Sequence, residues 1–589
     1  MKNRQTFASP KVSLSILLLT ALALQVTQTT AEAQQVGSTE LDPVEAIFAD
    51  FGRQGRPGVS VLVVKDGDVA SKFNRGMADV AAQIPISHAS VFNIGSVSKQ
   101  FTVFGVLLLQ EDGKLTLSDD IRRYIPELPD YGTTITLEHL ARHTSGLRSQ
   151  QYGALMGSWT QTDQRTHRQM LDLIRRQPKL LFEPGTRFSY SNAGTTLLAE
   201  VITRVSGIPF PEFMQRRIYE PLGMTSTSNR GEAARIIPDE VHSYYFEDSE
   251  LKKALNPSGV QGYTNVYSTT RDLAKWVANF QSRSVGSAES LQAMLSATSL
   301  PSGRPIEHRM GLYVTPYRGY QQIQHTGSDR GYTSYLGWFP ELNLTIVILA
   351  NVEGIDVFGS AYAIADQFIA EDATPPPAVL SETQTQPPYF EISHADLGQF
   401  TGQYWNDAVG AVRRIELLDG RLYYVRSDTN RSPLGPIGPA SFKMLDIEDD
   451  VTITFDVDQM TFEDQADAIT FERIINTPLS SATLGQYRGL YVSDEVSAVY
   501  RVSACDGELV VSTAARDLLR FSRLNGDTFY SNGWFLRSIR FERNDDSQVT
   551  GFLGGNVGIQ GVRFIKVTNP ALPAIRYDEC RQVQIPARG

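Results

Sequence analysis

Two residue types that together activate a hydroxyl group lie three positions apart at Ser96 and Lys99. The run Phe101–Leu109 follows them, and a run that is apolar on nearly every side predicts a buried helix that ends at Asp112–Gly113. At a helix start the two side chains share one face, so the lysine amine can meet the serine hydroxyl. Free N–H groups there favour the negative charge that forms when a serine attacks a carbonyl. The pattern therefore predicts acyl transfer through an activated serine.

The Ser-x-x-Lys pattern is weak by itself, because a second copy occurs at Ser249 and Lys252. That copy stands in a solvated stretch that stops at Pro257, so we interpret it as a chance match. Ser96 needs partners from elsewhere in the chain before it is assigned as a nucleophile.

Tyr190 and Asn192 lie between the turn Pro184–Gly185 and a predicted helix over Gly194–Val205. A tyrosine there can accept a proton from a serine hydroxyl if nearby cations lower its pKa, and the asparagine can hold the lysine amine and a substrate carbonyl. The alternative is a buried tyrosine beside an asparagine cap. Three more Tyr-x-Asn copies lack this context and begin at Tyr263, Tyr404 and Tyr530.

The third group of candidate residues is His325, Thr326, Gly327 and Ser328, on a predicted strand. Glycine in a strand marks the close approach of another backbone or a ligand, and an edge strand there could pair with an extended substrate. Lone histidines are more often structural. Two other histidines, His139 and His143, lie four residues apart on a predicted helix. A zinc protease needs a glutamate directly after the first histidine, and residue 140 is leucine, so this pair does not match that motif.

These three groups, in this order, resemble the serine β-lactamase and penicillin-binding protein superfamily, and most closely its class C-like branch of D-aminopeptidases, DD-carboxypeptidases and family VIII esterases. The stretches 140–147 and 346–351 also resemble this branch. The resemblance covers residues 42 to about 370. It implies an α/β (α+β) domain in which an antiparallel sheet is flanked by helices, with no metal and no cofactor.

The resemblance also implies a role for each candidate residue. Ser96 would be acylated, and Lys99 and Tyr190 would share the roles of base and proton relay, with the choice between them left open. Asn192 would position Lys99 and the substrate amide. The remaining substrate-binding residues would be His325, Thr326, Gly327 and Ser328, and the N–H groups of Ser96 and Ser328 would form the oxyanion hole.

His325 stands where β-lactamases carry a lysine, which predicts a weaker hold on a substrate carboxylate, because histidine near pH 7 is mostly neutral. We expect a serine hydrolase of short peptides or amides that contain D-residues. The alternatives are a carboxylesterase of the same family, a weak β-lactamase, and a cell-wall-binding or sensing protein without activity. An α/β-hydrolase is not expected, because the chain has no Gly-x-Ser-x-Gly motif.

The elements that must position these residues come from both ends of one domain. Strands over 59–64 and 69–75 flank Asp66–Gly67, a strong hairpin signal. Three more strands are predicted over 322–328, 332–338 and 344–349, with helices over 42–51 and 357–370. A sheet built from both ends of the domain places these two ends side by side, with a helical region between them in the sequence.

After residue 373 the sequence changes to a Pro-rich linker over 374–389. The rest repeats at an offset of 87 residues, so that Leu397–Tyr404 matches Leu484–Tyr491. Dense short strands with Asp-Gly turns predict two small antiparallel β-barrels, at 390–477 and 478–570, before a tail over 571–589. The arrangement resembles that of D-aminopeptidases, which implies lipocalin-like barrels. The barrels could equally be spacers or binding modules.

Residues 1–33 have the basic, apolar and small-residue pattern of a signal peptide, which leaves a catalytic domain over 34–373. Removing them changes the formal charge from −11 to −13, which disfavours nucleic acid as a partner. We expect a periplasmic or secreted protein without a stable membrane anchor, which acts on a small peptide, amide or ester and could form oligomers. In an oxidising compartment Cys505 and Cys580 could form one disulfide.

Overall fold

The computed structural model describes residues 42–369 and 392–567 apart from short gaps. The gaps are at residues 50, 53–54, 158, 161, 407–409, 428–429, 446–450, 464–467, 475–478, 514–515, 532, 534 and 557–558. The predicted signal peptide, linker and tail therefore lie outside the described residues. Among the described residues, no helix combines the length and the apolar character needed to cross a membrane.

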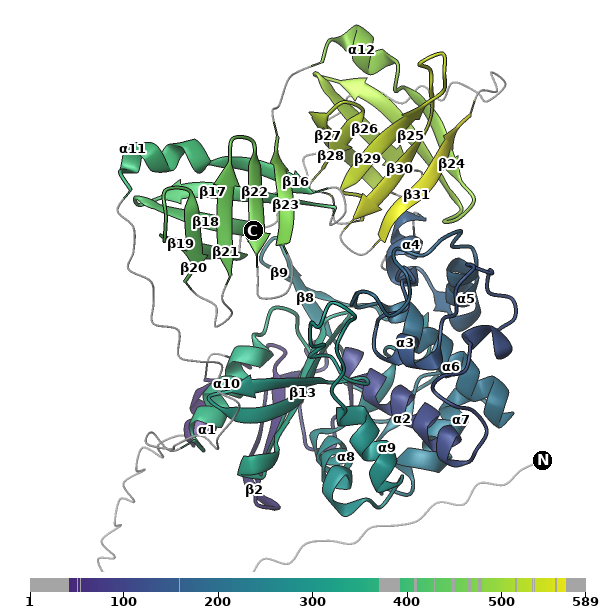
Figure 1. Cartoon of the computed structure of the whole chain (residues 1–589). Helices are drawn as coiled ribbons and strands as arrows, with labels where there is room; N and C mark the ends of the chain where they lie inside the picture. The colour runs from purple at the N-terminus through teal and green to yellow at the C-terminus, as the bar shows by residue number, and fades with distance from the viewer. Residues whose placement is uncertain are drawn as a thin grey trace, which may run out of the picture. The chain divides into compact units, whose positions relative to one another are not determined.

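A six-stranded antiparallel sheet is the centre of the first domain, with strand order β12-β13-β14-β15-β1-β2. Strands β13 and β2 of this sheet are labelled in Figure 1. The bounds are β1 Val59–Lys65, β2 Asp68–Arg75, β12 Tyr313–Tyr317, β13 Tyr320–Asp329, β14 Tyr332–Phe339 and β15 Leu344–Ala350. The predicted hairpin is present, and β1 pairs with β15, so the two ends of the domain meet within the sheet.

Strand β15 shows why the sheet needs cover on both faces. All seven of its residues are buried and six are apolar or small, which is typical of a strand with no solvated side. Val347 and Leu349 pack into the core shared with the helices α2, α6 and α8, while Ile346 and Ile348 pack into the core shared with α10. The alternation follows from the two-residue period of a strand.

Helices α2 to α9 lie in the sequence between the two halves of the sheet, whereas α1 precedes the sheet and α10 follows it. Their bounds are α1 Pro43–Ala46, α2 Ser98–Glu111, α3 Leu137–Ala141, α4 Gln150–Met156, α5 His167–Arg175, α6 Asn192–Ser206, α7 Phe210–Met214, α8 Thr270–Ser282, α9 Ala288–Leu295 and α10 Val357–Asp366. The helix predicted over 42–51 ends at Ala46, and the one predicted over 357–370 ends at Asp366.

Short strands join these elements. They are β3 Met77–Asp79, β4 Ile84–Pro85, β5 Phe92–Asn93, β6 Arg165–Thr166, β7 Ser228–Asn229, β8 Tyr244–Glu247, β9 Glu250–Lys253, β10 Ser258–Gly259 and β11 Val266–Ser268.

Two closed eight-stranded antiparallel barrels follow, so the predicted fold class is confirmed. Barrel 1 consists of β16 Gly402–Asn406, β17 Ala411–Leu418, β18 Arg421–Ser427, β19 Asn430–Pro436, β20 Ser441–Met444, β21 Thr452–Asp456, β22 Gln459–Glu463 and β23 Ala468–Arg473. Barrel 2 consists of β24 Gly489–Ser493, β25 Ala498–Cys505, β26 Glu508–Thr513, β27 Arg516–Asn525, β28 Thr528–Tyr530, β29 Ser538–Arg543, β30 Val549–Asn556 and β31 Ile559–Lys566. A short helix precedes each barrel, α11 His394–Leu397 and α12 Ser481–Gly485.

The repeat found in the sequence is also a repeat of contacts. The buried Tyr404 donates its hydroxyl to the carbonyl of Phe400 at 2.9 Å, and Tyr491 donates to the carbonyl of Tyr487 at 2.6 Å. Both tyrosines lie on the first strand of their barrel, 87 positions apart.

Cys505 lies at the end of β25 and is disulfide-bonded. Its predicted partner Cys580 lies outside the described residues, so the bond between these two cysteines stays a prediction.

Candidate active site

Ser96 lies in a 3-10 turn, Gly95–Val97, directly before α2. Ser96 was predicted to lie at the start of the helix, but α2 begins at Ser98, two residues after it. Gly95 has φ +52°, and a Cβ at this residue would lie 2.7 Å from the backbone nitrogen of Ser328. Only glycine allows this conformation and this close approach together. The reactive turn therefore contacts the strand β13 through its backbone.

Lys99 has a fully buried side chain. Its Nζ donates to Ser96 Oγ at 2.9 Å and to the carbonyl of Tyr263 at 3.2 Å. Burial lowers the pKa of Lys99 to about 7, and the carboxylate of Asp329 opposes this shift. A large fraction of the amine is therefore neutral near pH 7 and able to accept a proton.

Tyr190 lies beside both residues. Its ring centroid is 4.9 Å from Lys99 Nζ, and its hydroxyl shares a hydrogen bond with Ser96. Burial raises the pKa of Tyr190, and the bond to Ser96 only partly opposes this. The lowering by nearby cations that a tyrosine base requires is thus absent. Tyr190 keeps its proton, which favours Lys99 as the proton acceptor.

Asn192 is the first residue of α6, behind the N-cap Ser191. Its Nδ2 donates to Gln151 Oε1 at 2.8 Å, and its Oδ1 is buried without a partner among the described residues. Lys99 has the Tyr263 carbonyl as its second partner in place of the predicted Asn192. Neither Gln151 nor Tyr263 was predicted to belong to the site, although Tyr263 begins another Tyr-x-Asn copy.

Strand β13 carries the third group of candidate residues. Its first half, Tyr320–Gln324, pairs with β12, so β13 is not the edge strand that we predicted. Its second half, from His325 to Asp329, pairs only with β14 among the described residues. The expected free edge therefore exists at the candidate residues alone. Thr326 is half-buried there and Ser328 is exposed.

His325 is buried, and its Nδ1 lies 2.5 Å from the carbonyl of Thr326. Since a carbonyl only accepts, Nδ1 carries the proton and Nε2 is left as an acceptor, which has no partner among the described residues. Burial, aided by the charge of Lys99, lowers the pKa of His325 to about 3. The side chain is neutral at pH 7 and cannot act as the cation that lysine provides.

Two further histidines surround Tyr190, and we did not predict either as a site residue. The ring of His143 lies 4.4 Å from that of Tyr190 and 4.5 Å from that of His308. Both are fully buried, and burial lowers the pKa of each well below its usual value. The prediction that His143 lies on a helix is wrong, because α3 ends at Ala141 and His143 has φ +58°. Its Nδ1 accepts from the N–H of Ser191 and so helps to fix the turn before Asn192.

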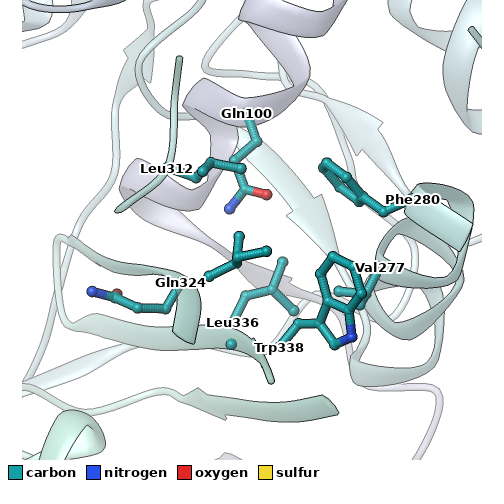
Figure 2. Close-up of a pocket in the computed structure, with 9 residues that line it drawn as sticks. Gln100, Val277, Phe280, Leu312, Gln324, Leu336 and Trp338 are labelled. Atoms are coloured by element: carbon teal, nitrogen blue, oxygen red, sulfur yellow. The ribbon is translucent and has the colours of Figure 1, made fainter. Parts of the chain in front are cut away.

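A small cavity lies between α2, α8 and the sheet (Figure 2). One of its lining residues is Gln100, which follows Lys99 in the sequence. Its volume of about 10 Å³ is at the lower limit for one water molecule. Apart from Gln100 and Gln324 its lining is apolar, and Gln100 Oε1 already accepts from Trp276 Nε1 at 2.9 Å. The cavity is therefore part of the packing behind the site and not a substrate pocket. The described residues contain no cluster of histidine, cysteine, aspartate or glutamate side chains placed to hold a metal ion.

The comparisons with known proteins agree with this geometry. The family model named Beta-lactamase matches residues 44–369. Penicillin-binding protein 4* of Bacillus subtilis (strain 168) is 27% identical over 328 residues, which are 53% of this chain and 71% of that protein. A D-aminopeptidase of Gluconobacter oxydans (strain 621H) is 28% identical over 327 residues, which are 54% of this chain and 60% of that protein.

Among solved structures, the octameric penicillin-binding protein homologue from Pyrococcus abyssi shares the fold with a TM-score of 0.51 and 24% identity. The match covers 73% of this chain and 98% of that one. Because the family model matches more than half of the chain, and because the two motif residues Ser96 and Lys99 are in contact, the sequence resemblance is confirmed: this protein belongs to the Beta-lactamase family of serine hydrolases.

Proposed function

We propose that this protein is an exported hydrolase that forms an acyl-enzyme on Ser96 and acts on short amides or peptides that contain D-residues. The observation that carries the proposal is the 2.9 Å contact of Ser96 Oγ with an amine whose pKa is lowered to about 7. A buried lysine with a lowered pKa is a general base matched to neutral pH. Support for export comes from the sequence of residues 1–33, and we propose the periplasm or the extracellular space.

Acylation follows from these contacts. Lys99 takes the proton of Ser96 as Oγ attacks the substrate carbonyl, and the N–H groups of Ser96 and Ser328 stabilise the oxyanion. The carbon–nitrogen bond then breaks. Tyr190 gives its proton to the leaving amine and recovers one from Lys99. A water molecule then attacks the acyl carbonyl carbon while Lys99 takes its proton. The bond to Ser96 Oγ breaks, the acid is released, and Lys99 returns the proton to Ser96.

Two buried acceptors without a partner among the described residues, one on Asn192 and one on His325, favour an amide with N–H donors over a substrate that presents a carboxylate. In the orientation that donates Nδ2 to Gln151, Asn192 leaves Oδ1 free for a substrate N–H. The neutral His325 leaves Nε2 free in the same way. An ester lacks the N–H, and a carboxylate would meet acceptors and no cation at these two residues. The D-aminopeptidase relative suggests D-configuration and an amino-end substrate.

A panel of substrates tests this proposal. D-alanine p-nitroanilide, L-alanine p-nitroanilide, a D-Ala-D-Ala peptide, benzylpenicillin and p-nitrophenyl acetate are compared by kcat/KM, with Ser96→Ala as the background. We expect the highest values for the D-alanine amides, and a slow covalent adduct with penicillin that mass spectrometry detects on Ser96. Preference for the L-amide would reject the D-specific form, and activity confined to the ester would replace it by an esterase.

A further inference from the structure

Barrel 2 holds a segment of the catalytic domain, residues 148–157, which contains α4. Leu155 is 4% exposed and Met156 is fully buried, and both belong to the apolar core of this barrel. Tyr500 on β25 donates its hydroxyl to the carbonyl of Met156 at 2.7 Å. A Cβ on Gly157 would lie 2.5 Å from the carbonyl oxygen of Val496, so backbone meets backbone. The end of the segment is thus part of the packing of barrel 2.

The beginning of the segment is held by charge. Arg148 is fully buried and pairs with Glu495, in the turn 494–497 between β24 and β25. Burial raises the pKa of Glu495, and the guanidinium of Arg148 opposes that rise. Arg176, at the end of α5, also reaches this turn and donates to Ser497 Oγ at 2.5 Å. A buried ion pair tolerates little change in geometry, because either partner left alone would be an unpaired charge.

The same segment also contacts residues of the active site. Gln151 accepts the hydrogen bond from Asn192 Nδ2, and the neighbouring Gln150 donates to Thr196 Oγ1 on α6 at 2.8 Å. The contacts of barrel 2 and the contacts of Asn192 therefore lie on one short helix.

Barrel 1 lacks the side chains that make these contacts. By the offset of 87 residues, alanine at position 408 corresponds to Glu495, and Arg413 corresponds to Tyr500. The strand register agrees, since Tyr404 pairs with Arg413 and Tyr491 with Tyr500. Arg413 donates to Tyr424 of its own barrel at 3.1 Å. The contact is thus specific to one copy of a repeated module.

We propose that barrel 2 is a positioning element of the active site: it fixes segment 148–157, and through Gln151 it holds Asn192 in the orientation that binds the substrate amide. This inference rests on the proposed function of Ser96 as nucleophile and of Asn192 as amide-binding residue. It predicts that barrel 2 affects the hydrolysis of amides more than the hydrolysis of esters, because only amides use Asn192 Oδ1 as an N–H acceptor.

The test uses the full chain with Tyr500→Phe and Glu495→Gln. For D-alanine p-nitroanilide we expect kcat/KM to fall about 10-fold, and for p-nitrophenyl acetate less than about 2-fold. Matched controls change the same chemistry in bonds of barrel 2 that do not involve the segment: Tyr491→Phe removes the bond to Tyr487, and Glu542→Gln removes the surface pair with Arg563. Both controls should keep the wild-type ratio of amide to ester hydrolysis.

Hydrogen–deuterium exchange gives a second readout that does not need a substrate. Exchange in peptides covering 148–157 and 191–196 should rise in Tyr500→Phe and Glu495→Gln and stay unchanged in the two controls. If exchange does not rise, or if amide and ester hydrolysis fall equally, the positioning role is rejected. If the wild-type enzyme cleaves no amide, the proposed function fails, and the exchange data still decide whether barrel 2 holds the segment that contacts Asn192.

Discussion

The two Ser-x-x-Lys copies of this chain have the same spacing and opposite surroundings. Ser96 and Lys99 lie at the start of a buried helix, with the amine in contact with the hydroxyl. Ser249 lies in the turn of the exposed hairpin β8–β9, and Lys252 Nζ pairs with Glu247 at 2.6 Å. The carboxylate of Glu247 raises the pKa of Lys252, whereas burial lowers that of Lys99 to about 7. Burial, and not the four-residue pattern, lowers the pKa of a lysine, and the helix start brings its amine into contact with the serine hydroxyl.

Secondary structure is one cause of this difference. Residues three apart on a helix lie on the same face, whereas successive side chains of a strand point to opposite faces. The first geometry brings hydroxyl and amine together, and the second does not. The other cause is solvation, because an exposed ammonium keeps its proton at pH 7, whereas burial lowers the pKa of Lys99 to about 7 and leaves much of the amine neutral.

The largest expected effect separates the two serines. Ser96→Ala should lower the hydrolysis of p-nitrophenyl acetate by at least about 10³-fold, because the acyl group has no other acceptor. Ser249→Ala should leave it unchanged. Initial rates and thermal melts of both variants measure this. Equal rates for wild type and Ser96→Ala, with the fold intact, would contradict the assignment of the nucleophile.

The second-largest expected effect separates the two lysines. Lys99→Met removes the proton acceptor and should lower kcat by about 10²–10⁴-fold, whereas Lys252→Met should have almost no effect. Lys99→Met should also raise the free energy of unfolding, by on the order of 3–5 kcal/mol at pH 6, because burying the ammonium is costly.

The sign of this stability effect depends on pH. The pKa of Lys99 is about 7 in the folded protein and near its ordinary value in the unfolded chain, so the unfolded state binds more protons between pH 7 and about 10. Wild-type stability should rise with pH across this window, and the advantage of Lys99→Met should shrink. Denaturant unfolding at pH 6, 8 and 9.5 measures it. An advantage that does not change with pH would show that Lys99 has no lowered pKa.

Much of this fold can be predicted from sequence for physical reasons. Strand β15 is buried on both faces and is therefore apolar apart from Thr345, which makes it recognisable as a strand. The barrels are recognisable because their turns and first strands repeat at a constant offset. Strand β12 was missed because it is a half-exposed edge strand that contains Pro316, and proline is tolerated at an edge.

The limits at the site have a different cause. Ser96, Lys99, Tyr190 and Asn192 are found by local patterns because each stands next to a helix start. His308 approaches Tyr190 only through the tertiary fold and has no local pattern of its own. The pKa values depend on burial, which a motif does not contain, so the motifs alone give no reason to prefer Lys99 over Tyr190 as the base.

The two tyrosines beside Lys99 provide a smaller contrast. Tyr190→Phe removes the hydroxyl that bonds to Ser96 and should lower kcat for amides by about 10–100-fold. Tyr263 contacts Lys99 through its backbone carbonyl, so Tyr263→Phe keeps that contact and should stay within about 2-fold of wild type. Steady-state kinetics with D-alanine p-nitroanilide compare them. Equal losses in both variants would show that the tyrosines act through packing around the lysine.

The smallest expected effect is the pH dependence of the wild-type enzyme. If neutral Lys99 is the base, kcat/KM should follow a single group with a pKa of about 7 and fall about tenfold from pH 8 to pH 6. Three other titratable groups near Lys99 should not titrate in this range, because burial lowers the pKa of His325 to about 3 and that of His143 well below 6.5, and raises that of Tyr190.

The profile is measured with p-nitrophenyl acetate after subtracting the Ser96→Ala rate, and Lys252→Met is the matched control. A profile that is flat between pH 6 and 8 in the wild type would show that Lys99 is not the group that takes the proton. A profile that moves in Lys252→Met would show that the exposed copy of the motif affects the chemistry, and it would break the distinction drawn between the two.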